Sequence, residues 1–456
     1  MEKIKDAHDP YAALRHSGYR RFLAGNFLSN IGRQGLSVAI AWQVYQWTNS
    51  ATALGLVGLA NVVPLMALVL PAGVLADRHD RRLLVQRSAA VSALLSLALA
   101  ATAWFHASVP HFAVLDQAND LLHRLALVFE RHADPTSLHF DHAALPLVYL
   151  ILFLQSVVRV LAGPSRAALV PLLIPPPALS NAVNWSSSTF ELATVAGPAL
   201  GGLIVAVWGA PVVYALDVFT SLSLALLLVG VKPAVPPPGS ARPVAGMLAG
   251  VQFMWRNQTV LAAMSLDLFA VVLGGATALL PIYADQILHV GPAGLGWLRA
   301  APSAGAICMA LFTAHRPSAR RPGLLMLWSV AGFGGAMTLF SYSTVLWLSL
   351  FALFLSGVFD NYSVVVRHSL VQLLTPDALR GRVTAVNQLF IGSSNEISAL
   401  RAGLSAALFG PVMAAGVGGL LTIAVTGVIA LLAPSLKHVP PLHELEPESE
   451  EDDRPL

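Results

Sequence analysis

The stretch GVLADRHDRR, residues 73–82, follows a long run of Leu, Val and Ala and ends with six consecutive residues that can carry charge. This concentration stands out, because 56% of the 456 residues are hydrophobic and only 11% are Asp, Glu, Lys or Arg. Soluble domains have about 25% charged residues. A short charged turn between apolar runs is typical of a loop that joins two membrane-spanning helices. The sequence therefore predicts a membrane protein that crosses the lipid bilayer many times.

Apolar windows recur along the whole chain, at the length of about 20 residues that a helix needs to cross a bilayer. They predict an all-α membrane protein with twelve transmembrane helices. The predicted spans are residues 22–46, 53–75, 83–105, 146–168, 180–206, 211–231, 259–282, 293–314, 323–342, 345–372, 383–408 and 411–433.

Lys and Arg are distributed unevenly over the loops between these spans. Alternate loops contain basic clusters near 78–87, 232–242, 316–321 and 380–382, whereas the loops at 48–52, 208–210 and 341–344 contain none. Loops rich in Lys and Arg face the cytoplasm, so both chain termini are predicted to be cytoplasmic. The net charge of +3 does not indicate a nucleic-acid partner, because the basic residues lie in short clusters between apolar runs.

Two similar segments, RAALVPLLIP at 166–175 and RHSLVQLLTP at 367–376, close the fourth and tenth spans. An offset of six spans preserves orientation, so the pattern predicts two parallel six-helix repeats with a substrate cavity between them near the bilayer midplane. The predicted domains are a cytoplasmic tail at 1–21, an N-terminal bundle at 22–231 with an extracytoplasmic insertion at 106–145, a cytoplasmic linker at 232–250, a C-terminal bundle at 251–434 and an acidic tail at 435–456.

The opening stretch resembles the signature of the major facilitator superfamily between spans 2 and 3, Gly-x-Leu-Ala-Asp-Arg-x-Gly-Arg-Arg. The matching residues include Gly73, Asp77, Arg78, Arg81 and Arg82, whereas Asp80 replaces a Gly. Two further motifs agree with the resemblance. Arg159 and Gly163 in span 4 match an Arg-x-x-x-Gly element, and span 5 matches the Gly-Pro-x-x-Gly-Gly motif of drug/proton antiporters through Gly197, Pro198, Gly201 and Gly202.

Within the superfamily the chain resembles the enterobactin-exporter group, also called the transmembrane secretion effector family. The resemblance lies in GGATALLPIYA at 274–284, ARRPGLLMLWS at 319–329 and LTPDALRGRVTAVNQLFIGSSNE at 374–396. It implies a fold of two six-helix pseudo-repeats that usually works as a monomer, and secondary transport across the bacterial inner membrane. It does not name a ligand, because members of the group have different substrates.

Asp77 is predicted to act as a gate. It ends span 2 on the same side as the start of span 11, and the N-terminus of a helix attracts a carboxylate. The resemblance implies that Asp77 docks there and closes the cytoplasmic side, with Arg78, Arg81 and Arg82 adding ion pairs. The alternative is a positively charged loop that only sets topology. Asp80 leaves two possibilities open, a looser latch or an altered turn, because Gly tolerates positive φ better.

Proton coupling needs a carboxyl group inside the membrane, where ionisable side chains usually face a cavity or a partner. Glu396 is the first candidate, followed by Glu191 and Asp267. Arg33, Arg159 and Arg299 are their predicted partners. The alternative for each carboxylate is a static buried ion pair. Substrate contacts are predicted for amide and aromatic residues of the spans, with membrane anchoring or packing as the alternative for the aromatic ones: Gln43, Asn61, Asn184, Trp185, Tyr283, Asn387 and Gln388.

The insertion at 106–145 contains apolar residues at helical spacing, which predicts an amphipathic helix on the bilayer or over the mouth of the cavity. Its six histidines match no compact metal site, so neither a metal nor a cofactor is predicted. No catalytic constellation stands out, so an enzyme is not expected. We predict proton-coupled export of a small amphipathic organic molecule, siderophore or drug-like, by alternating access. The alternatives are a lipid or lysophospholipid translocator and a non-transporting membrane scaffold or sensor.

Overall fold

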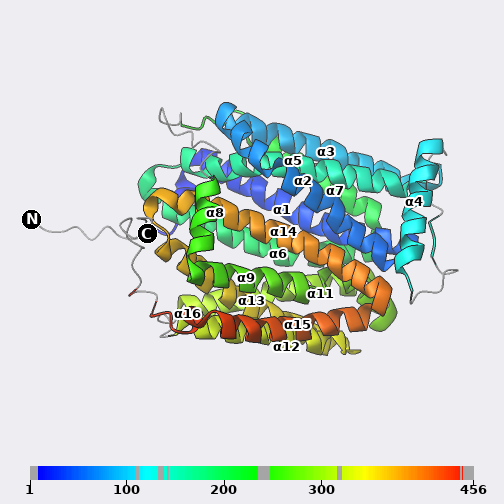
Figure 1. Ribbon diagram of the computed structural model, residues 1–456. Coiled ribbons are helices and arrows are strands. Elements are labelled where there is room, and N and C mark those ends of the chain that lie inside the picture. Colours follow the sequence, from blue (N-terminus) through cyan, green and yellow to red (C-terminus); the bar gives the residue numbers. More distant parts are fainter. Residues whose placement is uncertain are drawn as a thin grey trace, which may run out of the picture.

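A computed structural model of the chain describes residues 9–108, 112–131, 138–140, 143–234, 247–315, 321–441 and 444. Within these residues the fold is helical, and the long helices run side by side along one axis (Figure 1). The first half contributes α1 (Ser17–Thr48), α2 (Ala51–Arg78), α3 (Arg81–Trp104), α5 (Leu145–Leu169), α6 (Leu179–Trp208) and α7 (Ala210–Leu227). The second half contributes α9 (Gln258–Gly274), α11 (Gly291–Ala314), α12 (Pro322–Ser341), α13 (Leu346–Leu374), α14 (Asp377–Phe409) and α15 (Pro411–Leu432).

Shorter elements connect these helices. They are η1 (Ala13–Arg15), η2 (His106–Ser108), α4 (Ala113–Phe129), η4 (Val170–Leu172), η5 (Pro176–Ala178), α8 (Met247–Arg256), η7 (Thr277–Leu279), α10 (Leu280–Ile282), η8 (Tyr283–Ile287) and α16 (Pro434–Lys437). Ten helical segments of the described chain are long and apolar enough to cross a membrane, and α1 and α14 are not among them. Both carry polar residues of the cavity described below, which lowers their hydropathy. The prediction of an all-α membrane fold is confirmed.

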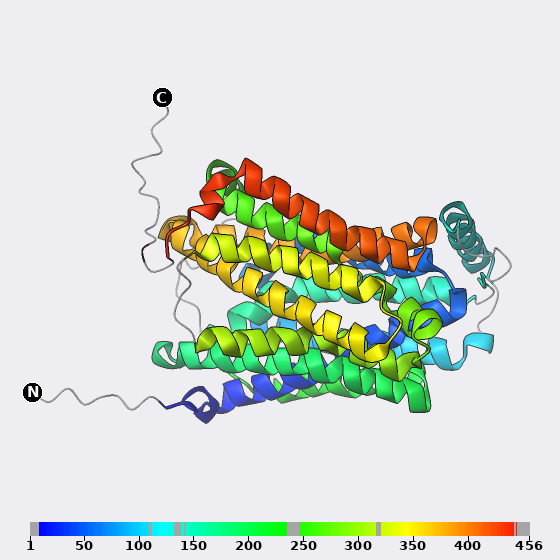
Figure 2. The same ribbon diagram turned by 90° about the horizontal axis from the view of Figure 1, so that it is seen from below.

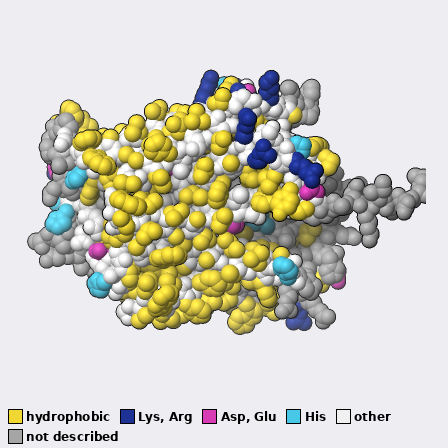
Figure 3. All heavy atoms as spheres, turned by 180° about the vertical axis from the view of Figure 1, so that it is seen from behind, with side chains coloured by type: hydrophobic (Ala, Val, Ile, Leu, Met, Phe, Trp, Pro, Cys, Tyr) yellow, Lys and Arg dark blue, Asp and Glu magenta, His cyan; other side chains and the backbone are white. Residues whose placement is uncertain are grey.

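The two ends of the helical bundle differ in character. We call one the arginine-rich end, because it holds Arg78, Arg81 and Arg82 where α2 gives way to α3. At the opposite end, the α4 end, helix α4 lies across the tips of the long helices (Figures 1 and 2). Between the ends, the surface is a band of hydrophobic side chains, while Lys and Arg gather at the arginine-rich end (Figure 3). Exposed residues such as Phe219, Trp328 and Leu431 suit contact with lipid.

The turn at the opening stretch is built around Asp80. Its side chain accepts a hydrogen bond from the backbone N–H of Leu83 at 3.1 Å and so caps the N-terminus of α3. Its φ is −59°, which any L-residue adopts. An Asp therefore fits this turn as well as a Gly, and it adds a cap that Gly cannot supply. Of the two possibilities that the sequence left open, the structure favours an altered, capped turn.

Buried apolar residues are arranged differently at the two ends. Towards the α4 end a single core cluster joins both halves, with Val38, Leu54 and Leu145 packed in one continuous group with Leu280 and Leu298. At the arginine-rich end the described residues form separate clusters. One belongs to the first half and contains Tyr19 and Leu228, and the others belong to the second half and include Leu266, Met326, Leu370 and Val383.

Glycines bring helices of the two halves into close contact towards the α4 end. A Cβ added at Gly403 of α14 would lie 2.5 Å from Cα of Gly55 in α2, and one added at Gly202 of α6 would lie 2.7 Å from Cα of Gly296 in α11. Only glycine permits backbones to approach so closely. Towards the arginine-rich end, an added Cβ would meet nothing within 4 Å at Gly73 of α2 or at Gly163 of α5.

The seventh span is broken next to the cavity. Helix α9 ends at Gly274, and after two residues the chain continues through η7, α10 and the π-helical turn η8. A broken helix inside a membrane leaves carbonyl groups that need partners. Arg401 of α14 supplies them, because its Nε donates to the Val272 carbonyl at 2.9 Å and its Nη2 to the Gly275 carbonyl at 2.7 Å.

The helix predicted within residues 106–145 is present as α4. The residues after it form a clasp over the α4 end. The buried Glu130 carboxylate accepts hydrogen bonds from the Ser50 hydroxyl at 2.7 Å and the Thr52 N–H at 2.9 Å, at the N-terminus of α2. The next residue, Arg131, donates its N–H to the Ala407 carbonyl of α14 at 3.0 Å. The clasp thus connects the first half to the second. His111, His132 and His142 of the insertion lie outside the described residues.

Candidate functional site

A central cavity of about 330 Å³ lies between the two halves. Polar side chains from both halves line it: Arg33, Ser37, Asn61, Gln155, Arg159, Arg299, Asn395 and Glu396. An N-half cavity of about 370 Å³ adjoins it and shares Arg33, Asn61 and Arg159. A C-half cavity of about 250 Å³ adjoins it on the other side and shares Thr277 and Arg299. Polar groups therefore line a chain of neighbouring cavities from one half to the other.

One ion pair crosses the central cavity from half to half. Nη2 of Arg159, on α5, lies 3.7 Å from Oε1 of Glu396, on α14. The same Nη2 donates to Oδ1 of Asn61 at 3.4 Å and to the Ser156 hydroxyl at 3.3 Å. Asn61 lies on α2, so three helices meet at this pair. A proton on Glu396 would remove the charge that attracts Arg159 and so weaken the connection between the halves.

Two more arginines line the central cavity. Arg33 of α1 donates to Oδ1 of Asn30 at 3.2 Å, within its own helix. Arg299 of α11 donates to the Ser37 carbonyl at 3.0 Å, which is a second connection between the halves. Both side chains are half-buried. Neither lies within ion-pair distance of a carboxylate among the described residues.

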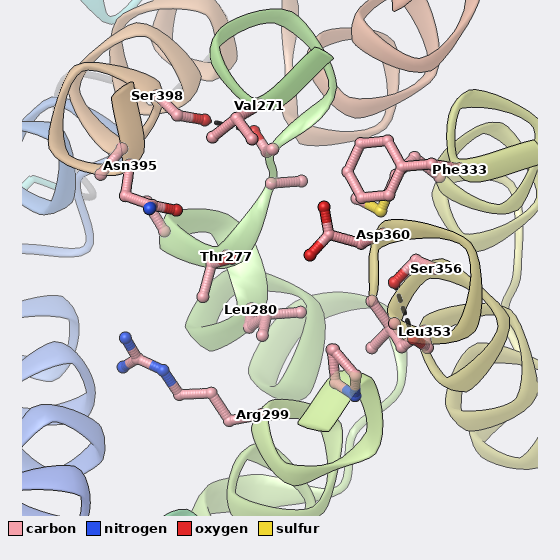
Figure 4. A pocket seen from close by; sticks show the side chains of 17 residues that line it. Val271, Thr277, Leu280, Arg299, Phe333, Leu353, Ser356, Asp360, Asn395 and Ser398 are labelled. Atoms are coloured by element: carbon pink, nitrogen blue, oxygen red, sulfur yellow. Dashed lines mark hydrogen bonds between the residues drawn. The ribbon is translucent and has the colours of Figure 1, made fainter. Parts of the chain in front are cut away.

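The C-half cavity is built around the broken seventh span. Figure 4 shows Val271, Thr277 and Leu280 of that span facing Phe333 of α12 and Asp360 of α13. The Asp360 carboxylate points from α13 into the cavity, towards the broken span, and the Arg299 side chain extends from α11 towards the helices of the first half (Figure 4). Asp360 is thus a second carboxylate that faces a cavity. The sequence marks it only as an ionisable residue within a span.

The N-half cavity contains Asp217 of α7 and Arg166 of α5. Asp217 is 3% exposed and accepts a hydrogen bond from the Ser96 hydroxyl of α3 at 2.6 Å. Gln155 also donates to the Ser96 hydroxyl, at 3.1 Å. These bonds fasten α3, α5 and α7 together inside the first half.

The other two candidate proton carriers lie elsewhere. Asp267 forms a buried ion pair with Arg367, with Oδ2 and Nη1 3.0 Å apart and exposed side-chain fractions of 8% and 2%. Arg367 also donates to Oδ1 of Asn387 at 3.2 Å. This arrangement fits the alternative of a static buried ion pair. Glu191, on α6, is not among the residues that line the three cavities.

The predicted substrate contacts are only partly brought together. Asn61 lines the central cavity. Gln43 is buried and accepts a hydrogen bond from the Tyr214 hydroxyl. Tyr283 is also buried, stacks near Phe340 and donates its hydroxyl proton to the Ser341 carbonyl at 3.0 Å. Both side chains thus support packing towards the α4 end.

The remaining predicted contacts lie towards the arginine-rich end. The Trp185 indole N–H donates to the Pro10 carbonyl at 2.9 Å, so this side chain holds the segment before α1. Asn184 beside it is exposed, as is Gln388 on α14. None of these three residues lines the cavities described above.

The opening motif and the span-5 motif occupy different environments. Asp77, in the last turn of α2, is paired with Arg81 at the start of α3, with Oδ1 and Nη2 3.5 Å apart, and Arg82 donates to the Val231 carbonyl at 3.0 Å. The span-5 motif packs tightly instead. A Cβ added at Gly197 would lie 2.5 Å from Cβ of Gln34 in α1, and one at Gly201 would lie 2.5 Å from Cα of Gly35.

Adjacent positions in the span-5 motif face opposite halves. Gly197 and Gly201 contact α1 in their own half, whereas Gly202 contacts α11 across the interface. The Pro198 carbonyl lies 2.6 Å from where a Cβ of Gly296 would stand, so it also faces α11. The motif therefore packs α6 closely against α1. On the opposite side of α6, Gly202 has no side chain and so allows α11 to approach.

Comparison with known proteins agrees with this architecture. The sequence profile of the Major Facilitator Superfamily matches residues 22–395. The enterobactin exporter EntS of Escherichia coli K12 is 26% identical over 431 residues, which cover 93% of each chain. The corresponding protein of Shigella boydii is 27% identical over 425 residues and covers 91% of this chain and 92% of its own.

A solved structure of a bacterial homologue of the iron transporter ferroportin, in an inward-facing state, shares the fold with a TM-score of 0.63 at 15% identity, over 93% of this chain and 99% of its own. The match to the superfamily profile covers most of the chain. The protein belongs to the major facilitator superfamily, and it is a multi-pass membrane transporter.

Proposed function

We propose that this member of the major facilitator superfamily exports a small amphipathic organic molecule, siderophore or drug-like, in exchange for protons. The observation that carries the proposal is the central cavity, which holds a single carboxylate, Glu396, in an ion pair that crosses the two halves. The similarity to a protein named as an enterobactin exporter supports the direction of transport.

The distribution of charge supports an orientation in the bacterial inner membrane. Lys and Arg gather at the arginine-rich end (Figure 3), and such clusters favour the cytoplasmic side. With that end and both termini in the cytoplasm, the joined core at the α4 end faces the periplasm. The separate cores at the other end then correspond to a transporter whose halves are closed outside and apart inside, as alternating access requires.

The Arg159–Glu396 pair offers a coupling mechanism. While Glu396 is ionised, its attraction to Arg159 holds α14 against α5 near the middle of the membrane. A proton that arrives from the periplasmic side neutralises Glu396 and releases Arg159. The halves can then rock to the state that opens inward, where the proton leaves. A monomer is sufficient for this cycle, because both partners belong to one chain.

The proposal is tested in everted membrane vesicles whose interior is acidified by respiration. A transported compound collapses part of the pH gradient, which a pH-sensitive dye reports. The compounds are enterobactin and a panel of amphipathic drugs. We expect at least one compound to collapse the gradient in vesicles with the wild-type protein, and not in vesicles with Glu396→Gln.

The matched control is Glu191→Gln, which makes the same chemical change on α6 outside the three cavities. It is expected to behave as the wild type. If Glu396→Gln transports with the same response to pH, Glu396 is not the proton carrier. If no compound moves in either direction, a scaffold or sensor explains the chain better than an exporter.

A further inference from the structure

The central cavity contains more positive than negative charge. Arg33, Arg159 and Arg299 line it together with one carboxylate, Glu396. That carboxylate lies nearest to Arg159. In the part of the chain that the structure describes, Arg33 and Arg299 have only neutral acceptors, the Asn30 amide at 3.2 Å and the Ser37 carbonyl at 3.0 Å. Two guanidinium groups thus face the cavity with no carboxylate within ion-pair distance.

The surrounding charges do not balance this excess. Arg33 is repelled by Arg159 and Arg166 and attracted by Asp217 and Glu396. The Asp217 carboxylate is already bonded to the Ser96 hydroxyl at 2.6 Å. Glu396 also attracts Arg299, in addition to Arg159. Four arginines, counting Arg166, are therefore balanced by two carboxylates, Asp217 and Glu396, and a net positive charge remains.

The remaining nearby carboxylate, Asp360, points into the C-half cavity, which Arg299 also lines (Figure 4). Among the described carboxylates, however, the one that attracts Arg299 is Glu396 and not Asp360. Its charged neighbours are Asp267 and Arg367, which are paired with each other. Asp360 therefore does not neutralise the guanidinium groups of the central cavity.

A guanidinium inside a membrane is costly unless it has an anionic partner or water. Its planar fork of N–H groups matches carboxylate and phosphate oxygens, and a cation-lined cavity attracts anions and repels cations. We propose that the transported molecule carries an anionic oxygen group, such as a carboxylate, that binds between Arg33 and Arg299. This inference rests on the proposed export function and narrows its substrate to organic anions.

The placement of the two arginines gives the anion a role in the transport cycle. Arg33 lies on α1 in the first half and Arg299 lies on α11 in the second, so one anion would contact both halves. Gln155 and Asn395, on either side of the same cavity, offer hydrogen bonds to the uncharged remainder of the molecule. The inside-negative membrane potential would also drive such an anion outward.

The test uses two dyes with the same xanthene ring system and opposite charge, fluorescein as the anion and rhodamine 123 as the cation. Rhodamine 123 is a methyl ester and so has no free carboxylate. Each dye is trapped inside proteoliposomes that contain the purified full chain, and its release is compared with release from protein-free liposomes. We expect the protein to accelerate the release of fluorescein and not that of rhodamine 123.

Arg33→Gln and Arg299→Gln are each expected to slow fluorescein release by about tenfold to hundredfold, because each removes a charge-assisted hydrogen bond. Arg299→Lys keeps the charge and should retain part of the rate. The control is Arg87→Gln, the same change at an exposed position of α3 outside the cavities. Unfolding temperatures in detergent identify any variant that does not fold. If Arg299→Gln does not fold, fluorescein release by Arg299→Lys is compared with that of the wild type instead.

The outcomes separate the two proposals. Faster release of rhodamine 123 than of fluorescein overturns the anion inference and leaves export in place. Equal fluorescein release by wild type, Arg33→Gln and Arg299→Gln also overturns it. If the wild-type protein moves neither dye, export of amphipathic organic molecules is contradicted, and the anion inference fails with it.

Discussion

The two halves of this transporter are joined at the α4 end and form separate cores at the arginine-rich end. At the α4 end, glycine crossings, a shared apolar core and the Glu130 clasp hold the two halves together. At the arginine-rich end, each half has its own core, and Asp77 is paired with Arg81 across the turn between α2 and α3. Many apolar contacts thus join the two halves at the α4 end, whereas the Asp77–Arg81 pair at the arginine-rich end lies within the first half.

The difference shows how one fold can serve two states. Apolar packing between close helices is stable and does not depend on pH, which suits a seal that must not leak protons. Exposed ion pairs contribute little individually and exchange partners easily, which suits a gate that opens and closes once per cycle. If the α4 end faces the periplasm, the state seen here is the one that admits substrate from the cytoplasm.

The largest effect is expected from filling a glycine crossing. A Cβ at Gly403 would lie 2.5 Å from the Gly55 backbone, so Gly403→Val should force α2 and α14 apart at the α4 end. Overpacking of this kind costs about 1–3 kcal/mol, which corresponds to a loss of transport of about 5- to 150-fold. The rate of substrate release from proteoliposomes measures it.

The control for this substitution is Gly427→Val on α15, where an added Cβ meets nothing within 4 Å. It should transport at the wild-type rate. Equal rates for the two variants would show that the crossing between α2 and α14 does not form the seal.

The clasp gives the next largest effect. Glu130→Ala removes the acceptor for Ser50 and for the Thr52 N–H at the start of α2. Unsatisfied buried donors cost about 1–3 kcal/mol, and the unfolding temperature in detergent should fall accordingly. Glu130→Gln keeps an acceptor oxygen and should recover part of the loss. Asp120→Ala, an exposed change on α4, is the control. A wild-type unfolding temperature for Glu130→Ala would mean that the insertion is only a surface element.

The seal and the gate were predictable from the sequence to different degrees. The spans follow from apolar windows, because lipid selects hydrophobic side chains along the whole length of a helix. The sequence also placed Glu396, Arg159 and Arg299 inside spans, where ionisable residues are rare. It could not tell which arginine each carboxylate meets, because partners such as Arg159 and Glu396 are 237 positions apart and depend on how the halves pack.

For other residues, the local sequence does not indicate the contact that the side chain makes. Glu130 is one of several acids in a polar insertion, and nothing in the insertion shows that it reaches Ser50 and Thr52 at the start of α2. Trp185 is of a residue type that often contacts ligands, yet its indole N–H binds the Pro10 carbonyl in the segment before α1. Arg401 was visible as an intramembrane charge, but its role follows from the break in the seventh span, which the hydropathy pattern does not show.

Asp77→Asn should produce a smaller effect, and one limited to the gate. Among the described residues its carboxylate has one partner in the present state, Arg81, at 3.5 Å. Loss of this partly exposed ion pair should lower the free energy of unfolding by no more than about 0.5 kcal/mol, so the unfolding temperature should change little. In the opposite state we propose that it docks on the N-terminus of α14, which is worth about 0.3–2 kcal/mol. Transport should therefore slow by about 2- to 30-fold. A slower rate with a lower unfolding temperature would instead indicate a structural role in the present state.

The smallest effect is expected at Asp80, where substitution should change the stability of the turn between α2 and α3 without changing transport. Asp80→Gly restores the residue that is usual in the signature but removes the side-chain cap on α3. A Gly at a cap lowers the free energy of unfolding by only a few tenths of a kcal/mol, whereas Asp80→Ala should lower it by about 1 kcal/mol. Because the φ of residue 80 is −59°, Gly gains nothing from its conformational freedom there. We therefore expect the unfolding temperature to fall in the order Asp, Gly, Ala at position 80. The rate of transport should stay within twofold of wild type in all three proteins, because residue 80 shapes the turn whereas Asp77 is the residue proposed to act in the gate.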